Sequence, residues 1–181
     1  MPISRFLAFL GLLVFALSAR ADNIDVRAAS ISLREDAYAL DADFDIILTP
    51  TLEDILAKGV PLNFLLEAEV IRPRWYWFND KVAQATLQYK LSYNSLTRQY
   101  RVSLGTLYQN FATLAEAVRF FSSVRNLPVA ERAALQPGNA YQAAVRMRLD
   151  VSQLPKPFQI TALGSREWNL SSEWHRFAVT P

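Results

Sequence analysis

The chain has 181 residues, of which 51% are hydrophobic and 20% charged, and it contains no cysteine. The lack of cysteine excludes disulfides, thiolate zinc sites, thiol nucleophiles and redox pairs. The formal charge of +2 comes from Arg5 and Arg20, so the chain after residue 21 carries 17 basic and 17 acidic side chains. This balance gives no electrostatic support for a general nucleic-acid or anionic-lipid partner.

Residues 1–21 have the pattern of a secretory signal peptide. Arg5 precedes an apolar run over residues 6–17, and residues 19–21, ARA, place small side chains where a signal peptidase reads them. The run is shorter than the roughly 20 apolar residues that a membrane-spanning helix needs, so we expect cleavage rather than an uncleaved anchor. The sequence therefore predicts export to the periplasm of a single domain, residues 22–181, with no integral membrane segment.

Side chains that alternate with a period of two predict strands over most of this domain. The first strand is expected at residues 24–33, with a change of parity near Ala28 that is typical of a β-bulge. Further strands are predicted at residues 38–46, 60–70, 83–93, 100–104, 141–151 and 168–174.

Residues 83–93 and 100–104 are predicted to form an antiparallel hairpin. The intervening NSLT is a cluster of turn-forming residues. Pairing Tyr93 with Tyr100 places apolar residues opposite each other at every second position, so this is the register that we expect.

Two segments change to a helical period. Thr113 and Glu116 form a capping box before an apolar face that continues to Val124. A shorter helix is predicted from Thr51, as its N-cap, to Gly59, where a left-handed residue ends it. The order of elements predicts a mainly β (β-rich α+β) fold. We expect an antiparallel sheet, as a sandwich or a curled sheet, with two helices packed on it.

Few residues in the chain suit catalysis. His175 is the only histidine, and it falls on a polar face, where we expect it at the surface. A histidine metal site or a Ser-His-Asp triad would have to be built around this one imidazole. The sequence also lacks a glycine-rich phosphate loop and a Gly-x-Ser-x-Gly elbow. We therefore predict no catalytic residue, no metal and no cofactor.

Three aspartates share one face of the predicted strand at residues 38–46. These are Asp41, Asp43 and Asp45. They would bind calcium only if a loop supplied further oxygen ligands, and the strand alternation gives no such loop. We expect a solvated face.

Glu67 and Glu69 also share a strand face. A glycan hydrolase built on these residues or on Asp80 would need two carboxyl groups facing one groove, one of them with a pKa raised by burial. On an outward face such carboxylates usually pair with a cation of a neighbouring strand, and Arg101 or Lys90 would serve.

Residues 72–78, RPRWYWF, are the best candidate for a binding surface. The proposed contact residues are Arg72, Arg74, Trp75, Tyr76, Trp77 and Phe78. Four consecutive aromatic side chains cannot all face the core, because alternate side chains of a strand point in opposite directions. Aromatic residues beside arginines are enriched at interface hot spots. The alternative is that the rings cap the open end of the sheet, with the arginines stacked over them.

Several segments together resemble one protein family. RPRWYWFNDKVAQATLQYKLSYNSLTRQYRVSLG, QNFATLAEAVRF, YQAAVRMRLDVSQLPKPFQITAL and WNLSSEW are similar to the proteobacterial domain-of-unknown-function family 4390, over nearly all of the mature chain. The resemblance implies an exported protein without an assigned activity, whose gene often lies beside that of a membrane sensor histidine kinase. It implies no catalytic residues.

These observations predict a non-catalytic accessory protein of the periplasm that binds an envelope partner, such as a membrane sensor kinase. One alternative is a carrier of an apolar ligand, with an enclosed cavity lined by residues such as Phe64, Leu87 and Phe121. Another is a carboxylate-based glycan hydrolase.

Overall fold

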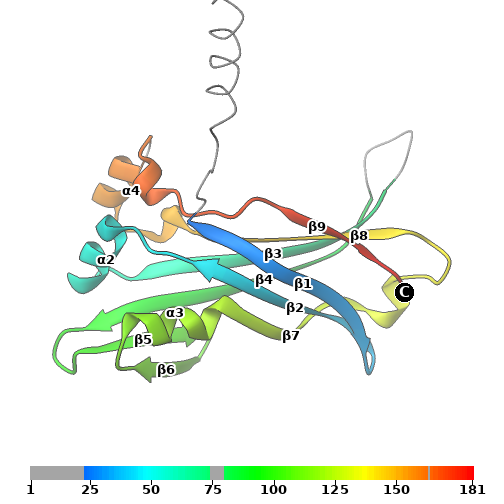
Figure 1. Cartoon of the computed structure of the whole chain (residues 1–181), viewed down its shortest axis with the longest axis horizontal. Coiled ribbons are helices and arrows are strands. Elements are labelled where there is room, and N and C mark those ends of the chain that lie inside the picture. Colours follow the sequence, from blue (N-terminus) through cyan, green and yellow to red (C-terminus); the bar gives the residue numbers. More distant parts are fainter. Residues whose placement is uncertain (1–22, 74–79, 163) are drawn as a thin grey trace, which may run out of the picture.

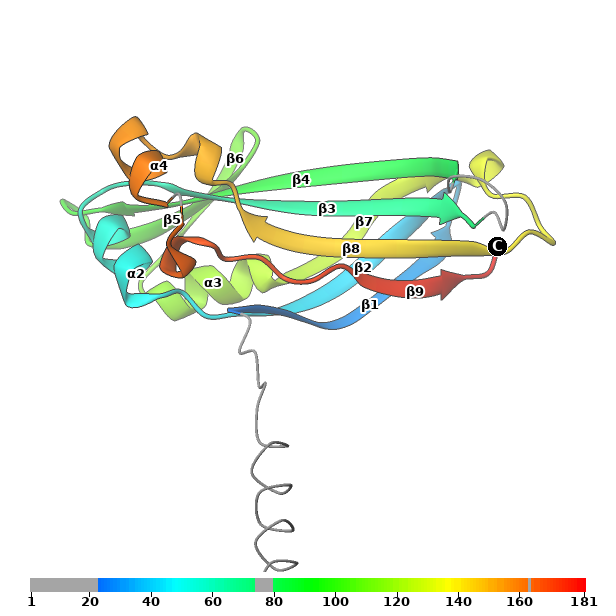
Figure 2. The same cartoon turned by 90° about the horizontal axis from the view of Figure 1, so that it is seen from above.

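The computed structural model describes residues 23–73, 80–162 and 164–181. Their strands form two antiparallel sheets, one of three strands and one of six (Figure 1). The smaller sheet lies along one face of the larger one, with its strands running obliquely across it (Figure 2). Buried side chains from both sheets join in one hydrophobic cluster. The predicted class, a β-rich α+β fold of sandwich type, is confirmed.

The smaller sheet has the strand order β1-β2-β7. Its strands are β1 (Ile24–Arg34), β2 (Ala37–Ile46) and β7 (Ser123–Glu131). The register of β1 against β2 shifts between Val26 and Ala28, which confirms the bulge that the change of parity predicts.

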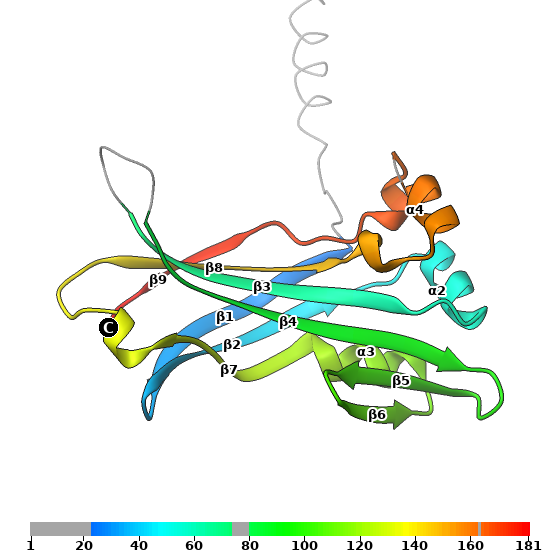
Figure 3. The same ribbon diagram turned by 180° about the vertical axis from the view of Figure 1, so that it is seen from behind.

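The larger sheet has the order β6-β5-β4-β3-β8-β9. Its strands are β3 (Leu62–Arg72), β4 (Asp80–Asn94), β5 (Gln99–Leu104), β6 (Leu107–Phe111), β8 (Tyr141–Leu149) and β9 (His175–Val179). Tyr93 pairs with Tyr100, so the predicted hairpin register is confirmed. Figure 3 shows β5 and β6 at the edge of this sheet, beside helix α3.

Three α-helices and three short 3₁₀ turns complete the described part of the chain. They are α2 (Pro50–Ala57), α3 (Leu114–Ser122), α4 (Lys156–Ala162) and the turns Arg132–Ala134, Val151–Gln153 and Arg166–Trp168. The capping box of Thr113 and Glu116 begins α3 as predicted, because each of these residues bonds to the backbone N–H of the other.

The predicted N-cap of α2 is wrong by two residues. Thr49 is the cap: its hydroxyl accepts a hydrogen bond from the N–H of Leu52, and Pro50 occupies the first helical position. The hydroxyl of Thr51 donates to the carboxylate of Glu167 instead. Gly59 follows the helix with a φ of +88°, which confirms the predicted left-handed residue.

The strand predicted at residues 168–174 is wrong. Trp168 ends a 3₁₀ turn, and residues 169–174 are irregular apart from one bridge between Ser171 and Arg148. Leu170 and Ser172 are nevertheless buried, because this segment follows the end of β8 and bonds to its backbone. Burial of alternate residues therefore arises here without a regular strand.

Four elements were not predicted: β6, β7, β9 and α4. Most residues of β6 are exposed, so it has no apolar alternation to detect. β7 contains Pro128, and its register against β2 shifts twice. The predicted helix over residues 114–124 ends at Ser122, and Val124 is buried as a residue of β7.

The core joins α3 to the larger sheet. Phe121 of α3 and Phe64 of β3 are fully buried, and their ring centroids lie 4.8 Å apart. Tyr89 of β4 packs on Phe121 at 5.7 Å. Phe64 and Phe121, two of the residues expected to line a cavity for an apolar ligand, are therefore in contact with each other.

Candidate functional site

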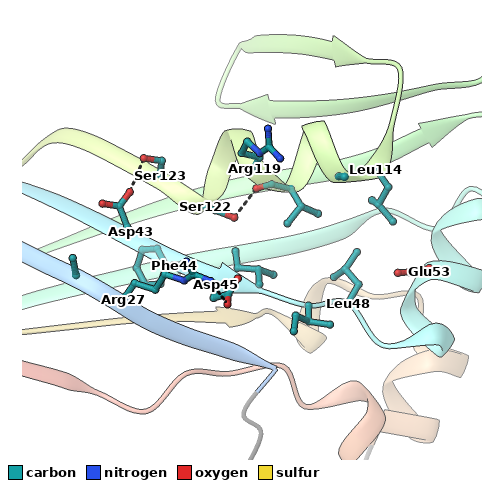
Figure 4. A pocket seen from close by; sticks show the side chains of 15 residues that line it. Arg27, Asp43, Phe44, Asp45, Leu48, Glu53, Leu114, Arg119, Ser122 and Ser123 are labelled. Carbon is teal, nitrogen blue, oxygen red and sulfur yellow. Dashed lines mark hydrogen bonds and ion pairs between the residues drawn. The ribbon is translucent and has the colours of Figure 1, made fainter.

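An open groove of about 1050 Å³ lies between the end of β2 and helix α3 (Figure 4). This volume is at the upper end of the range for ligand sites in proteins. Ile46 and Leu48 line it from the strand side, and Leu114 and Val118 from the helix. The exposed side chain of Ile47 lies at its edge. The groove therefore combines apolar walls with an opening to solvent.

The groove exists because α3 runs directly into β7. Ser122 is the last residue of α3 and Ser123 the first of β7, with no loop between them. The pairing of β7 with β2 consequently ends at Asp43, which is opposite Ser123. A helix is about 10 Å wide, whereas neighbouring strands lie about 4.8 Å apart. The helix therefore cannot continue the ladder, and β2 runs on with a strand neighbour only on its β1 side.

The end of β2 has a free backbone edge that faces α3. The N–H of Ile47 donates to the carbonyl of Asn23, 2.8 Å away, at the start of β1. Since alternate residues of an antiparallel strand point their N–H and C=O groups to opposite sides, those of Asp45 also face β1. Those of Phe44 and Ile46 face the groove. The pair Asp43–Ser123 is of the kind whose hydrogen bonds lie at the flanking residues, so Phe44 still belongs to this ladder through Ser122. Among the described residues, no strand pairs with Ile46 on this side.

The carboxylates of β2 are already neutralised. Asp43 accepts hydrogen bonds from Arg125 at 2.7 Å and from Ser123 at 2.8 Å, and these bonds, that of Arg125 first, hold its pKa below the usual value. Arg27 lies 2.6 Å from Asp45 across the strand pair.

The third aspartate of β2, Asp41, pairs with Arg34 and also accepts a hydrogen bond from the backbone of Asn126 at 2.8 Å. Each aspartate thus has its own arginine. The described residues contain no group of three or more His, Cys, Asp or Glu side chains that could hold a metal ion.

Two charged side chains of the groove have no ion pair among the described residues. Arg119 projects from α3 and Glu53 from the first turn of α2, and both are exposed. Figure 4 places Arg119 on the helix wall and Glu53 toward the end of the groove at α2. The groove therefore presents a positive charge and a negative charge at separate positions along its length.

Glu67 lies in a second polar cluster, on the outer face of the larger sheet. Arg146 and Arg148 of β8 reach its carboxylate at 2.6 and 3.1 Å. Arg146 also lies over the ring of Trp174, with the guanidinium carbon 4.4 Å from the ring centroid. Burial acts to raise the pKa of Glu67, but hydrogen bonds from the two arginines outweigh it and hold the pKa below its usual value.

The predicted partners of Glu67 and Glu69 are wrong. Arg146 stands opposite Glu67 because β8 is a neighbour of β3, whereas the predicted Arg101 lies on β5. Glu69 pairs with Lys81 of β4 at 2.8 Å. The general acid of a glycan hydrolase needs a raised pKa, so the lowered pKa of Glu67 is the opposite of what that role requires.

The predicted binding segment lies mostly outside the described residues: Arg74, Trp75, Tyr76, Trp77 and Phe78 belong to the part of the chain that is not described. Its role as a contact surface stays a prediction.

Arg72 is the proposed contact residue of that segment that the structure describes. It ends β3 and donates to Asp80 at 2.7 Å, at the last pair of the β3–β4 ladder. His175 is exposed at the start of β9, as predicted, with its ring centroid 5.9 Å from that of Phe177.

Sequence periodicity did not find the groove. The signal that it leaves is small: Ile46, Ile47 and Leu48 are three consecutive apolar residues that break the alternation of β2. The groove also depends on a helix that is followed by a strand without a loop. Periodicity identifies each element separately, so it does not detect such a direct junction.

Comparison with known protein families assigns the chain to one of them. Residues 21–178 match the profile of a family described as a domain of unknown function (DUF4390). No curated protein and no solved structure gives a match. In the part of the chain that the structure describes, no helix has the length and apolar character needed to cross a membrane.

Proposed function

We propose that this chain, which belongs to the DUF4390 family, is exported to the periplasm and acts there by binding another envelope protein, with no catalytic activity of its own. The signal-peptide pattern of residues 1–21 supports the compartment. The groove between β2 and α3 is the observation that carries the binding role. A membrane sensor kinase is the partner that the family resemblance suggests.

Several contacts favour binding over catalysis. The carboxylates that an enzyme would use are held in ion pairs with arginines, at Asp43, Asp45 and Glu67. The groove instead offers apolar side chains from helix α3 and from the end of β2, together with the exposed Ile47. Apolar anchors surrounded by polar residues are typical of protein-binding surfaces.

In-cell crosslinking tests this proposal. A photo-reactive amino acid would replace Ile47, which is 63% exposed at the groove, and, in a matched control, Leu96, which is 94% exposed in the turn between β4 and β5. A third position, Trp77, would probe the predicted aromatic surface. Proteins captured at each position would be identified by mass spectrometry, and the interaction would be repeated with the two purified proteins.

The expected result is that one envelope protein is captured from Ile47 and not from Leu96, and that it binds the purified chain. Capture from Trp77 alone would assign the binding surface to residues 72–78 instead of the groove. Failure to capture any protein from all three positions would contradict a binding role.

A further inference from the structure

Strand β6 is an unprotected edge of the larger sheet. It is the last strand in the order of that sheet, and in Figures 1 and 3 it forms the lower margin of the described part of the molecule. Four of its five residues are exposed. Natural proteins usually protect such an edge with charged residues, proline or bulges, because an open edge pairs with any further strand. The sequence of β6, LYQNF, has no charge and no proline, and its pairing with β5 shows no register shift.

The other outer strands of the two described sheets carry these protections. In the smaller sheet, β1 has the bulge near Ala28 and bears Arg27 and Arg34, and β7 contains Pro128 and two register shifts. In the larger sheet, β9 bears Arg176. Among these four edges, β6 alone lacks every such feature. This difference is expected if a further strand covers the edge in the working protein.

The backbone of β6 offers hydrogen-bonding groups on its open side. The turn from β5 to β6 has two residues, so Leu104 and Leu107 form the hydrogen-bonded pair that closes this hairpin. Backbone groups of successive residues point to opposite sides of an antiparallel strand. Tyr108 and Asn110 therefore direct their N–H and C=O groups away from β5. Within the described residues, no strand pairs with β6 on that side.

We propose that β6 pairs with β6 of a second copy of the chain, antiparallel about a twofold axis at Gln109, so that the two larger sheets become one continuous sheet. In this register Tyr108 of each copy lies opposite Asn110 of the other. The two pairs make four backbone hydrogen bonds. A twofold axis at Tyr108 would place Asn110 opposite the turn, and an axis at Asn110 would place Tyr108 opposite a residue beyond the end of the strand.

The apolar side chains match in the same register. Leu107 of each copy falls opposite Phe111 of the other, in the kind of pair whose side chains approach most closely. Leu107 is 73% exposed, and the ring of Phe111 lies 5.3 Å from that of Phe120, which is also exposed. The second copy's Leu107 would cover Phe111 and the neighbouring edge of Phe120. Pairing would thus remove apolar surface from water on both copies.

The polar side chains of the edge are held ready for such a pairing. The guanidinium carbon of Arg101 lies 4.4 Å from the ring centroid of Tyr108, and its Nε donates to the side chain of Asn110 at 2.9 Å. Both side chains are therefore partly ordered before a second copy binds, which lowers the entropy cost of association. At the axis the two Gln109 side chains face each other, and each amide can donate to the other.

A strand of another protein could use the same backbone groups. A second copy is favoured because one register places apolar opposite apolar and polar opposite polar along the whole strand. The edge is also separate from the candidate site, since no residue of β6 lines the groove between β2 and α3. The dimer is therefore independent of the proposed function.

Cysteine crosslinking tests the register. The chain has no cysteine, so a single introduced cysteine forms a disulfide only between two molecules. In the exported protein, Gln109→Cys places its two copies directly opposite each other, about 4.5 Å apart between Cα atoms, which suits a disulfide. The matched control Tyr108→Cys places them diagonally, about 7–8 Å apart, which is too far. Non-reducing electrophoresis should show crosslinking at least tenfold faster for Gln109→Cys.

Charge exchange at the axis tests the dimer in solution. Sedimentation velocity of the purified exported protein should show a monomer–dimer equilibrium at micromolar concentration. Gln109→Lys and Gln109→Glu should each raise the dimer Kd at least tenfold, because like charges then lie opposite each other. An equal mixture of the two variants should restore the dimer. Gln84→Lys, at an exposed position of β4, is the matched control and should leave the Kd unchanged.

Three results would overturn the proposed dimer. These are a monomer at all concentrations, equally fast crosslinking of Gln109→Cys and Tyr108→Cys, and a dimer that both charge variants leave intact. Capture of an envelope protein from Ile47 would stand in each case, because that position lies at the groove and not on β6. Failure of the dimer and failure of the proposed function are therefore distinguishable.

Discussion

The two sheets differ in how completely their strands are paired. In the larger sheet, β3 pairs with β4 along its whole length and with β8 over residues 64–71. In the smaller sheet, β2 loses its β7 neighbour at Asp43 and continues to Ile46 beside a helix. The long strands of the larger sheet are held by continuous pairing, and the interrupted pairing of β2 leaves the groove. Stability and binding of the envelope partner are therefore expected in different sheets.

The largest expected effect on the free energy of unfolding is at the buried face of α3, compared with its exposed face. Phe121→Ala should lower the free energy of unfolding by about 3–5 kcal/mol, because it empties the contact with Phe64 and Tyr89 that fixes the helix to the larger sheet. The control Phe120→Ala, at a side chain that is 43% exposed, should cost about 1 kcal/mol or less. Chemical denaturation measures both variants, and equal losses would contradict this division of the helix.

A smaller effect is expected at the arginine-bound carboxylate of the larger sheet. Glu67→Gln should lower the free energy of unfolding by about 1–2 kcal/mol at neutral pH, because Arg146 and Arg148 lose their shared partner. Glu69→Gln is the matched control, and it should cost about 0.5 kcal/mol or less, since its partner Lys81 is half-exposed.

The same carboxylate predicts a dependence on pH. The folded-state pKa of Glu67 lies below its ordinary value of 4.5, so its contribution is complete above that pH and is lost as the pH falls through the lower folded-state pKa. Denaturation curves measured between neutral and acidic pH should therefore converge for the wild type and Glu67→Gln. A constant difference between the two proteins at all pH values would contradict the assignment.

The smallest effect is expected at the ion pairs of the smaller sheet. Asp43→Asn should change the free energy of unfolding by about 0.5 kcal/mol or less, because Asp43 and Arg125 are both largely exposed to water. Raising the salt concentration should reduce even this difference. A loss as large as that of Glu67→Gln would mean that the smaller sheet depends on its charges as much as the larger one does.

Sequence reasoning succeeded where the strands are regular. The alternation of apolar residues located β1 to β5 and β8, and the pairing of Tyr93 with Tyr100 followed from side-chain matching alone. It failed where alternating burial and strand pairing do not occur together. Residues 168–174 alternate in burial without forming a strand, and β6 forms a strand without alternation.

The groove could not be predicted in this way. It depends on which elements become neighbours, and the pairing of β2 with β7 joins residues about 80 positions apart in the chain, such as Asp43 and Ser123. The position of the arginines beside Glu67 has the same origin, since the register of β8 on β3 decides that Arg146 is opposite it.

Amide hydrogen exchange in the free protein tests the central claim most directly, because it reports each backbone position of β2 separately. The amides of Asp45 and Ile47, which face β1, should exchange slowly, and that of Ile46, which faces the groove, should exchange at least tenfold faster. Equally slow exchange at all three amides would mean that β2 is paired on both sides up to Ile46, and it would contradict the account of the groove as the place where the pairing of β2 with β7 stops.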